Sequence, residues 1–541
     1  KSKLSFVIWT TTIWTLPGNL AIALHPDESY AVVKALNGEM YIMAEALVEK
    51  VMKIGGFDSY EIVETHPGSF YENMLASHPF LPKTSRLVLA DYVTMDSGTG
   101  CVHTAPGFGA DDYETCKRYG MEMVVPVDDQ GRHTDYAGKY AGMGTDESNP
   151  VILEDMKKAG SLFASEDIVH SYPHCWRCKN PIIFRATPQW FCSVDAFKDE
   201  ACAACDEVRW VPGWGIDRMK SMIRERADWC ISRQLWWGHQ IPAWYCDECG
   251  HINVKREDPT ECEKCGCKHL TREEDVLDTW FSSALWPFST MGWPDKDAAD
   301  LNYWYPTSVM VTGYDIIFFW VARMIFSGME QMKKEPFKTV FIHGLVRDDK
   351  GRKMSKSLGN GIDPLEMAEK YGADALRFNL ITGNSPGNDM RFYVEKCEAM
   401  RNFCNKIWNA SRFVMMNLTI DHVELPKKLE LEDKWILSKL NTLIREVTDN
   451  MDAFELGVAS AKIYDFIWDN YCDWFIELTK NRLNSDDQTT RENAQNVLCY
   501  VLIETLKLLH PFMPFITEEI WQALPHEGEF LMLSKWPEYN E

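Results

Sequence analysis

The pattern of apolar and polar positions divides the chain into a β-rich first part and a helical last part. Between Lys1 and about His170, short alternating segments such as Leu87 to Val93 lie between turn residues, which is typical of a compact barrel-like β domain. After about Val394, apolar side chains recur every 3.6 residues, which predicts a helical bundle that continues to the end of the chain. Two runs show this spacing and predict buried helix faces: Ile436, Leu440, Leu443, Ile444, Val447 and Met451, then Tyr464, Ile467, Trp468, Tyr471, Phe475 and Leu478.

Continuous apolar runs in the middle of the chain predict a third kind of architecture. Residues 305–365 follow a strand, helix and strand order, and Thr339 to Val346 is apolar enough to be a buried strand. These features suit half of a Rossmann-like parallel sheet. The pattern from about Asp206 to Arg233 is helical. We therefore predict a multidomain α/β protein with parts at residues 1–170, 171–304, 305–365, 366–395 and 396–541.

Composition and charge limit the function classes. A chain of 541 residues with 45% hydrophobic and 25% charged residues is an ordinary globular protein of several domains. A formal net charge of -24 argues against a general nucleic-acid coating protein, although a local basic strip can still face phosphates. The apolar stretch Ile316 to Phe326 is too short for a bilayer and contains Arg323, so we expect no membrane contact. The chain opens without Met in a strand-like run, which suggests a fragment.

Cysteine spacing predicts a metal site. The 17 cysteines include four C-x-x-C pairs and no visible secretory leader, which favours a cytoplasmic protein with metal sites over a disulfide framework. Two of these pairs form a knuckle at residues 246–267, where two tight turns would make a tetrahedral thiolate cage for structural Zn²⁺ from Cys246, Cys249, Cys262 and Cys265. The other two pairs, Cys175 with Cys178 and Cys202 with Cys205, could form a second cage or remain without metal.

Two further segments carry polar chemistry. Lys353 and Lys356 lie three positions apart on a glycine-flanked loop after the predicted strand, where they can follow a polyphosphate at the carboxyl edge of a parallel sheet. Thr10, Thr11 and Thr12 are adjacent and offer hydroxyls that can fix an ester-linked aminoacyl adenosine and its water.

Both segments resemble one enzyme family. The string HGLVRDDKGRKMSKSLGN, residues 343–360, resembles the KMSKS signature of class I aminoacyl-tRNA synthetases. The strings WTTTIWTLP and GTGCVHTAPGFGADDY resemble the editing domain of the isoleucyl, valyl and leucyl group. The resemblance implies a β-rich editing insertion, the second half of a Rossmann-like catalytic domain, a stem-contact region at 366–395 and an anticodon-binding helical domain.

The resemblance also implies roles for residues in the synthetic site. Lys353 and Lys356, with Ser355 and Ser357, would stabilise the pyrophosphate that leaves ATP, a substrate bound with Mg²⁺. Gly313 and Asp315 would approach the ribose of ATP, and His343 and Gly344 its adenine. Trp280 and Trp320 would enclose a small aliphatic amino acid.

In the editing site, the resemblance implies a second set of roles. Thr10, Thr11, Thr12 and Asn19 would shape the pocket, His103 would help select the side chain and ester, and Asp112 would bind the α-ammonium. Such a site is needed because one methylene is worth only about 1–3 kcal/mol in an apolar pocket.

The two halves differ in the substrate that they indicate. Residues 1–228 are isoleucyl-like, whereas residues 229–541 are valyl-like, and the sequence leaves open whether a junction near residues 228–234 is natural. We expect a monomeric valine enzyme that uses tRNA and ATP. Two alternatives are an isoleucine enzyme and a stand-alone deacylase or tRNA-binding protein.

One expected motif is missing. The family binds ATP phosphates through an HIGH signature, and no H-x-G-H string occurs here. We expect that half of the site upstream of Lys1 and predict that this chain alone does not form aminoacyl-adenylate.

Overall fold

The computed structural model describes residues 3–175, 178–355 and 358–540. The chain forms two compact units, Lys1–Pro188 and Gln189–Glu541, and each has its own hydrophobic clusters. The first unit extends beyond residue 170, where the β-rich pattern was expected to end.

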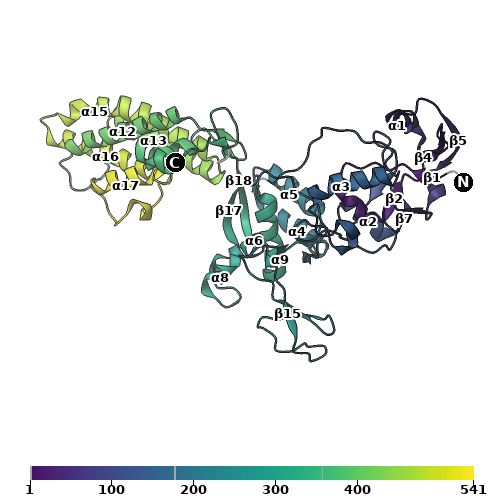
Figure 1. Ribbon diagram of the computed structural model, residues 1–541. Coiled ribbons are helices and arrows are strands. Elements are labelled where there is room, and N and C mark those ends of the chain that lie inside the picture. The colour runs from purple at the N-terminus through teal and green to yellow at the C-terminus, as the bar shows by residue number, and fades with distance from the viewer. Residues whose placement is uncertain (1–2, 176–177, 356–357, 541) are drawn as a thin grey trace. The chain divides into compact units, whose positions relative to one another are not determined.

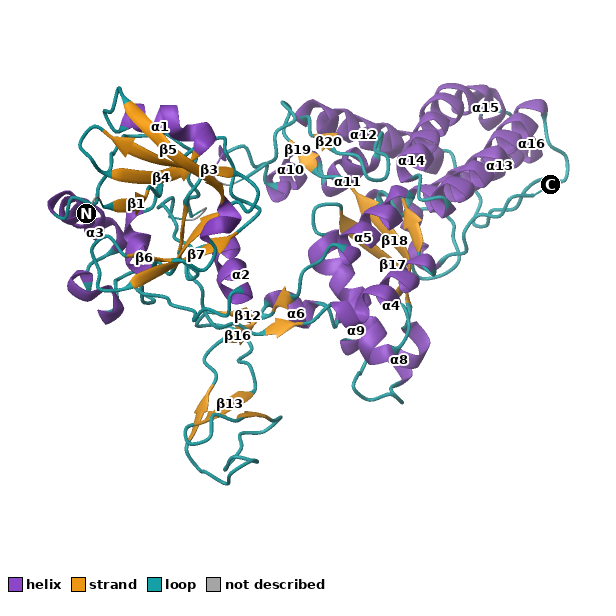
Figure 2. Cartoon of the chain, turned by 90° about the vertical axis from the view of Figure 1, so that its right-hand side faces the viewer, coloured by secondary structure: helices purple, strands orange, loops and turns teal. Residues whose placement is uncertain are grey.

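The first unit contains two four-stranded sheets rather than one closed barrel (Figure 2). One has the order β1-β4-β3-β5, with β1 at Leu4–Phe6, β3 at Ser29–Ala35, β4 at Met40–Ala44 and β5 at Tyr60–Pro67. The other has the order β6-β7-β2-β8, with β2 at Ala21–Leu24, β6 at Leu75–Ser77, β7 at Thr84–Leu89 and β8 at Val102–Thr104. The helices are η1 (Ile13–Gly18), η2 (Glu45–Leu47), α1 (Val48–Ile54), η3 (Gly68–Tyr71), α2 (Ala110–Arg118), η4 (Asp135–Tyr140) and α3 (Thr145–Lys158). The β-rich prediction is confirmed.

A three-stranded parallel sheet lies at the centre of the second unit (Figure 1). Its order is β10-β18-β17, from Arg209–Val211, Phe337–His343 and Thr307–Gly313. The helices around this sheet are α4 (Asp195–Asp206), α5 (Trp214–Arg224), the π-helix η5 (Ile317–Val321) and α9 (Ala322–Met332). The predicted strand, helix and strand order at 305–365 is confirmed, and β17 and β18 end side by side at Gly313 and His343.

The helical reading of residues 206–233 was partly wrong. Helix α5 has the predicted buried positions Met219 and Ile223, but β10 precedes it and β11 (Trp229–Cys230) follows it. Strand β10 has three residues, and its partner β18 lies more than 100 residues later. A pairing so distant in sequence leaves no local periodicity to detect.

Short elements connect the sheet to the rest of the unit. They are β9 (Phe191–Cys192), β12 (Ser232–Arg233), β13 (Ala243–Cys246), β14 (Ile252–Val254), β15 (Leu270–Arg272), β16 (Val276–Leu277), α6 (Thr279–Ser283), α7 (Trp286–Ser289), α8 (Ala299–Trp304), β19 (Val346–Arg347), α10 (Pro364–Tyr371), α11 (Ala373–Ile381) and β20 (Met390–Arg391).

The last part of the chain is the predicted helical bundle. Its helices are α12 (Val394–Met416), α13 (Leu431–Asp452), α14 (Leu456–Asp465), the π-helix η7 (Phe466–Phe475), α15 (Ile476–Leu483), α16 (Gln488–Leu509) and α17 (Pro514–Gln522). Beyond Gln522 the chain has only the short turn η8 (Leu531–Leu533), so the expectation of helix to the end was wrong. The predicted faces lie in the core, except that Leu478 is 46% exposed. No helix in the described ranges has the length and apolar character needed to cross a membrane.

Candidate functional site

The carboxyl ends of β17 and β18 bring together four of the predicted ATP-site residues. Gly313 ends β17 opposite His343, which ends β18. A Cβ atom on Gly313 would lie 2.9 Å from Asp315 Oδ1 and 3.4 Å from His343 Cε1, so a larger residue there would displace the Asp315 side chain. Gly344 is more strictly limited, because a Cβ there would lie 1.9 Å from the Asn388 backbone carbonyl oxygen. The result is an edge where backbone, a carboxylate and an imidazole are all close to one another.

The lysine loop reaches this edge. Lys353 is exposed, and its Nζ lies 3.8 Å from Asp315 Oδ2. Asn360 holds the loop together, since its Oδ1 accepts from the Ser355 backbone N–H and its Nδ2 donates to Asp348 Oδ2. Lys356 and Ser357, which were also predicted as catalytic, lie outside the described residues. Lys353 and Ser355 are the predicted loop residues that the structure describes.

Two buried or half-buried aspartates organise the loop, and the sequence analysis missed both. Asp348 accepts hydrogen bonds from the Asn360 amide and from Arg352, and these lower the pKa of Asp348 to about 2. Asp389 accepts from the Leu345 backbone N–H, from Tyr314 Oη and from Arg347. The partners of Asp389 lie 42 to 75 positions away, whereas Asp348 lies within the string 343–360 and was given no role there.

The two predicted pocket tryptophans do not face each other. Trp280 stacks on Phe319 with ring centroids 5.9 Å apart, whereas Trp320 packs on the core cluster around α9. The reason is that neighbouring residues on a helix point in different directions. The indole Nε1 of Trp320 is buried and has no hydrogen-bond partner among the described residues.

Two arginines pair with Asp278, two residues before Trp280. Asp278 is buried and accepts from Trp229 Nε1, and it pairs with Arg233 at 2.9 Å and with Arg323 at 3.5 Å. Burial lowers the pKa of Arg323 to about 10, and its guanidinium lies 4.2 Å from the centroid of the Trp229 ring. Arg323 lies in the first turn of α9, which directly continues η5 with Phe319, and no sequence motif predicted this cluster.

The four predicted metal-binding cysteines come together as expected. The Sγ atoms of Cys246, Cys249, Cys262 and Cys265 all lie within 4.8 Å of one another. They stand on two equivalent turns, in which the backbone N–H groups of Gly250 and Gly266 donate to the first cysteine of each pair. Both glycines have positive φ, at 67° and 76°, which these tight turns require. Four sulfur donors at this spacing fit a tetrahedral zinc ion.

The described residues of each unit, taken by itself, hold no second cysteine cage. Cys202 and Cys205 are buried on α4, and burial raises the pKa of Cys205 to about 12.

In the first unit, a buried hydrogen-bond chain joins two segments of the predicted editing site. Asn19 Nδ2 lies 2.6 Å from His103 Nδ1, and His103 Nε2 lies 3.0 Å from Thr15 Oγ1. Thr15 Oγ1 in turn donates to the Thr12 carbonyl oxygen at 2.7 Å. Since the Asn19 amide donates to Nδ1, the proton of His103 is on Nε2. Burial lowers the pKa of His103 to about 3, so the ring is neutral.

The predicted ammonium-binding carboxylate lies close to this chain. Asp112 is in the first turn of α2, and its Oδ2 accepts from the Ala105 backbone N–H at 2.9 Å. Ala105 is two residues after His103, on the continuation of β8. Burial raises the pKa of Asp112 to about 6, although the Ala105 bond opposes this rise. A half-buried carboxylate without a cationic partner among the described residues suits an ammonium ligand.

The threonine run lies at the same place. A bridge between Trp9 and Val102 aligns the run with β8, and Thr10 Oγ1 accepts from the Thr12 backbone N–H at 3.0 Å. Thr11 is exposed, and its Oγ1 lies 3.5 Å from Thr12 Oγ1. All six predicted editing residues therefore belong to connected segments.

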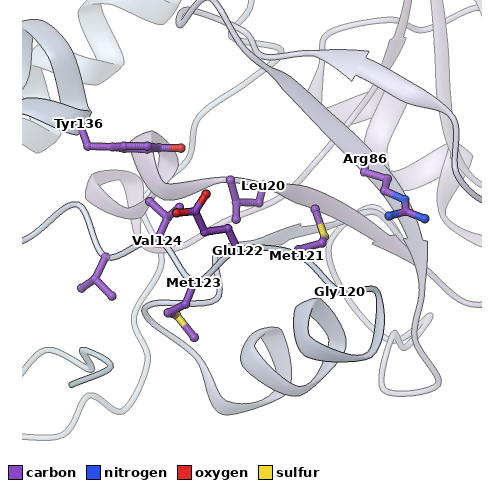
Figure 3. Close-up of a pocket in the computed structure, with 9 residues that line it drawn as sticks. Leu20, Arg86, Gly120, Met121, Glu122, Met123, Val124 and Tyr136 are labelled. Carbon is purple, nitrogen blue, oxygen red and sulfur yellow. The ribbon is translucent and has the colours of Figure 1, made fainter. Parts of the chain in front are cut away.

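A separate groove of about 540 Å³ opens on the first unit and includes none of these residues (Figure 3). Its lining is Leu20, Arg86, Gly120, Met121, Glu122, Met123, Val124, Val125 and Tyr136.

Three known protein families match parts of this chain. The family described as "tRNA synthetases class I (I, L, M and V)" matches residues 107–393. "Leucyl-tRNA synthetase, editing domain" matches residues 1–160, and "Anticodon-binding domain of tRNA ligase" matches residues 433–541.

Similar sequences and a similar fold were also found. The valine--tRNA ligase of Clostridium tetani is 50% identical over 479 residues, which are 87% of this chain and 54% of the relative. That of Clostridium acetobutylicum is 51% identical over 468 residues, 86% of this chain and 53% of the relative. The chain thus spans about half the length of these relatives. A solved methionyl-tRNA synthetase of Mycobacterium tuberculosis shares the fold, with a TM-score of 0.52, 20% identity and 66% of each chain covered.

Proposed function

This chain belongs to the class I family of tRNA synthetases, and on that premise we propose that it serves the ATP-dependent attachment of valine to tRNA and the hydrolysis of mischarged tRNA. The observation that carries this proposal is the 50% identity to a valine--tRNA ligase over most of the chain. That match covers 87% of the chain, so it extends well before residue 229 and favours valine over isoleucine for both halves.

For the synthetic reaction, we assign Lys353 to the ATP phosphates. Its ammonium lies on a loop beside Asp315, at the sheet edge where β17 ends at Gly313 and β18 ends at His343. A mobile cation there can follow the charge that builds on the leaving pyrophosphate. We extend the same role to Lys356, Ser355 and Ser357 from the family signature. Trp280 and Trp320 keep their proposed place in the amino-acid pocket, and Phe319, which stacks on Trp280, is added to it.

For editing, we assign the α-ammonium of the misattached amino acid to Asp112. Thr10, Thr11 and Thr12 supply hydroxyls for the ester and the attacking water. His103 has both ring nitrogens engaged and a low pKa, so we assign it to pocket shape and selection rather than proton transfer. Because the His103 ring is neutral and the Asn19 amide is held in place, this side of the proposed editing pocket presents a single arrangement of hydrogen-bond donors and acceptors.

The four-cysteine cluster would hold a structural zinc ion. Its four sulfur donors leave no position for a substrate, and the bound ion would cross-link the two turns. We propose that the bundle from residue 396 binds the anticodon and that 366–395 contacts the tRNA stem. A cytoplasmic monomer remains our expectation.

Hydrolysis of two mischarged substrates tests the editing function. The chain is mixed with threonyl-tRNA for valine and with valyl-tRNA for isoleucine, and Asp112→Ala is the matched control. We expect clearance of the threonyl ester. Clearance of the valyl ester alone would favour the isoleucine alternative, and no clearance above the control would overturn the assignment.

ATP–pyrophosphate exchange tests the synthetic function. Because the sequence has no H-x-G-H string, we expect no valine-dependent exchange by this chain alone. Exchange that depends on Lys353 would contradict that expectation. Clearance of mischarged tRNA without anticodon preference would favour a stand-alone deacylase.

A further inference from the structure

The hairpin formed by β6 and β7 turns one face toward the segment that carries the editing residues. Ser77 pairs with Thr84, and the His78 backbone N–H donates to the Lys83 carbonyl at 2.9 Å, so His78 and Lys83 form the next cross-strand pair. Side chains two positions apart on a strand point the same way, which adds Ser85 to this face. None of these three residues was singled out from the sequence.

All three side chains bind the end of η1 and the residue that follows it. His78 Nε2 lies 3.0 Å from the Leu16 carbonyl oxygen, and Lys83 Nζ donates to the Pro17 carbonyl at 2.5 Å. Ser85 Oγ donates to Asn19 Oδ1. Since η1 lies between Thr12 and Asn19, the hairpin fixes the C-terminal end of η1 and the Asn19 side chain.

Lys83 is the charged member of this set. No carboxylate forms an ion pair with it in the described part of the chain, and the titratable groups that face it are His78, His103 and the phenol of Tyr136. The Tyr136 ring lies 5.1 Å from Nζ, and Glu122 is the carboxylate that acts on that phenol. The ammonium therefore interacts chiefly with a carbonyl at the C-terminal end of a helical turn, where a cation is favourable.

We propose that Lys83, through its bond to the Pro17 carbonyl, is a positioning residue that holds the threonine run and Asn19 in the geometry that hydrolysis of mischarged tRNA requires. The inference rests on the proposed editing function. Lys83 touches none of the reacting groups that we assign, so it acts through η1.

The protonation of Lys83 gives this role a pH signature. Burial lowers the pKa of Lys83 from 10.5 to about 8. As pH rises through 8, the charge-assisted bond becomes a weaker neutral one, and editing should decline. Folding stability should change in the opposite direction, because the unfolded chain binds the proton more tightly and stability rises between pH 8 and 10.5. A role in stability alone would not make activity fall while stability rises.

The test compares wild type, Lys83→Arg and Lys83→Met in hydrolysis of threonyl-tRNA for valine between pH 6 and 9.5. The uncatalysed rate is subtracted, and kcat and KM are determined separately. Titration of the substrate ammonium affects every variant equally and cancels in ratios of rates.

We expect kcat of Lys83→Met to be about 10- to 100-fold below wild type at pH 7, with a smaller change in KM. The ratio of wild-type kcat to Lys83→Met kcat should approach 1 at pH 9.5. Lys83→Arg stays cationic, so its kcat should remain above that of Lys83→Met from pH 6 to pH 9.5. Denaturation with urea at each pH shows that the variants are folded.

Equal kcat for wild type and Lys83→Met at pH 7, or a constant ratio across the pH range, would overturn the inference while leaving the editing function intact. If Lys83→Met does not fold, the ratio of wild-type kcat to Lys83→Arg kcat is measured across the pH range instead. A constant ratio would again overturn the inference. A wild type that is no faster than Asp112→Ala would overturn the editing function and this inference with it.

Discussion

At the scale of single residues, Asp112 shows that a carboxylate placed to bind an ammonium group can lower the folding stability of the protein. Its carboxylate is buried enough for the pKa to rise from 3.8 to about 6, and it accepts a hydrogen bond from the Ala105 backbone N–H. The native state therefore binds a proton more tightly than the unfolded chain. Ionisation of Asp112 therefore does not lower the free energy of unfolding below pH 4, and it lowers it by its full amount above pH 6.

Replacement of Asp112 by Asn should consequently separate activity from stability. We expect Asp112→Asn to lose at least 100-fold in clearance of mischarged tRNA, because the substrate ammonium loses its charged partner. Above pH 6 the variant should be more stable than wild type by about 1–3 kcal/mol, and near pH 4 the difference should vanish. Urea denaturation at pH 4 and 7.5 measures this. Equal stability at both pH values would contradict the assigned cause of the pKa shift.

Gly344 is a second residue whose role can be isolated. A Cβ there would lie 1.9 Å from the Asn388 carbonyl oxygen, whereas a Cβ on Gly361 would meet nothing within 4 Å. Gly344→Ala should destabilise the second unit by about 1–3 kcal/mol through the forced backbone shift. Gly361→Ala is the matched control and should be neutral or slightly stabilising. Denaturation followed by tryptophan fluorescence compares the two. A neutral Gly344→Ala would show that the loop around Asn388 moves freely.

At the scale of elements, the zinc knuckle can be tested by two cysteine substitutions. Cys249→Ser removes one of the four clustered sulfurs and should abolish stoichiometric zinc and the order of β13, β14 and β15. Cys267→Ser is the control, since Cys267 is buried beside the cluster and donates to the His269 carbonyl, outside the set of four. It should retain zinc. Metal analysis by mass spectrometry and hydrogen exchange over 243–272 provide the measurements. Zinc lost equally from both variants would contradict the four-sulfur assignment.

Element by element, the sequence predicted what local patterns encode. The 3.6-residue spacing identified α13, and the cysteine spacing identified the knuckle. The spacing from Tyr464 to Leu478 predicted a helix, but it did not predict that Phe466–Phe475 is a π-helix. Strand β10 was missed because its only support is a distant strand.

The candidate site divides in the same way. Residues in contiguous motifs, such as Lys353 and His103, were identified from the sequence. Asp389, Arg323 and Lys83 were missed because each acts on a partner more than 40 positions away. A contact of that kind depends on the fold rather than on neighbouring residues.

At the scale of the whole molecule, the two compact units differ in what supports them. The first is built on β-sheet clusters around residues such as Leu24, which is fully buried. The second contains the helical bundle, where Phe403 is fully buried and its ring lies 4.4 Å from that of Tyr464. Since each unit has its own core, we expect two unfolding transitions rather than one.

Two core substitutions should shift these transitions separately. Leu24→Ala should cost about 2–5 kcal/mol and Phe403→Ala about 3–5 kcal/mol, through the cavities that they leave. At roughly 2–4 °C per kcal/mol, each should lower one midpoint by several degrees and leave the other in place. Calorimetry measures both midpoints, and the temperature at which editing is lost should follow the Leu24→Ala transition alone. A common shift of both midpoints by either variant would show that the units unfold as one, and editing could then not be treated as a property of the first unit.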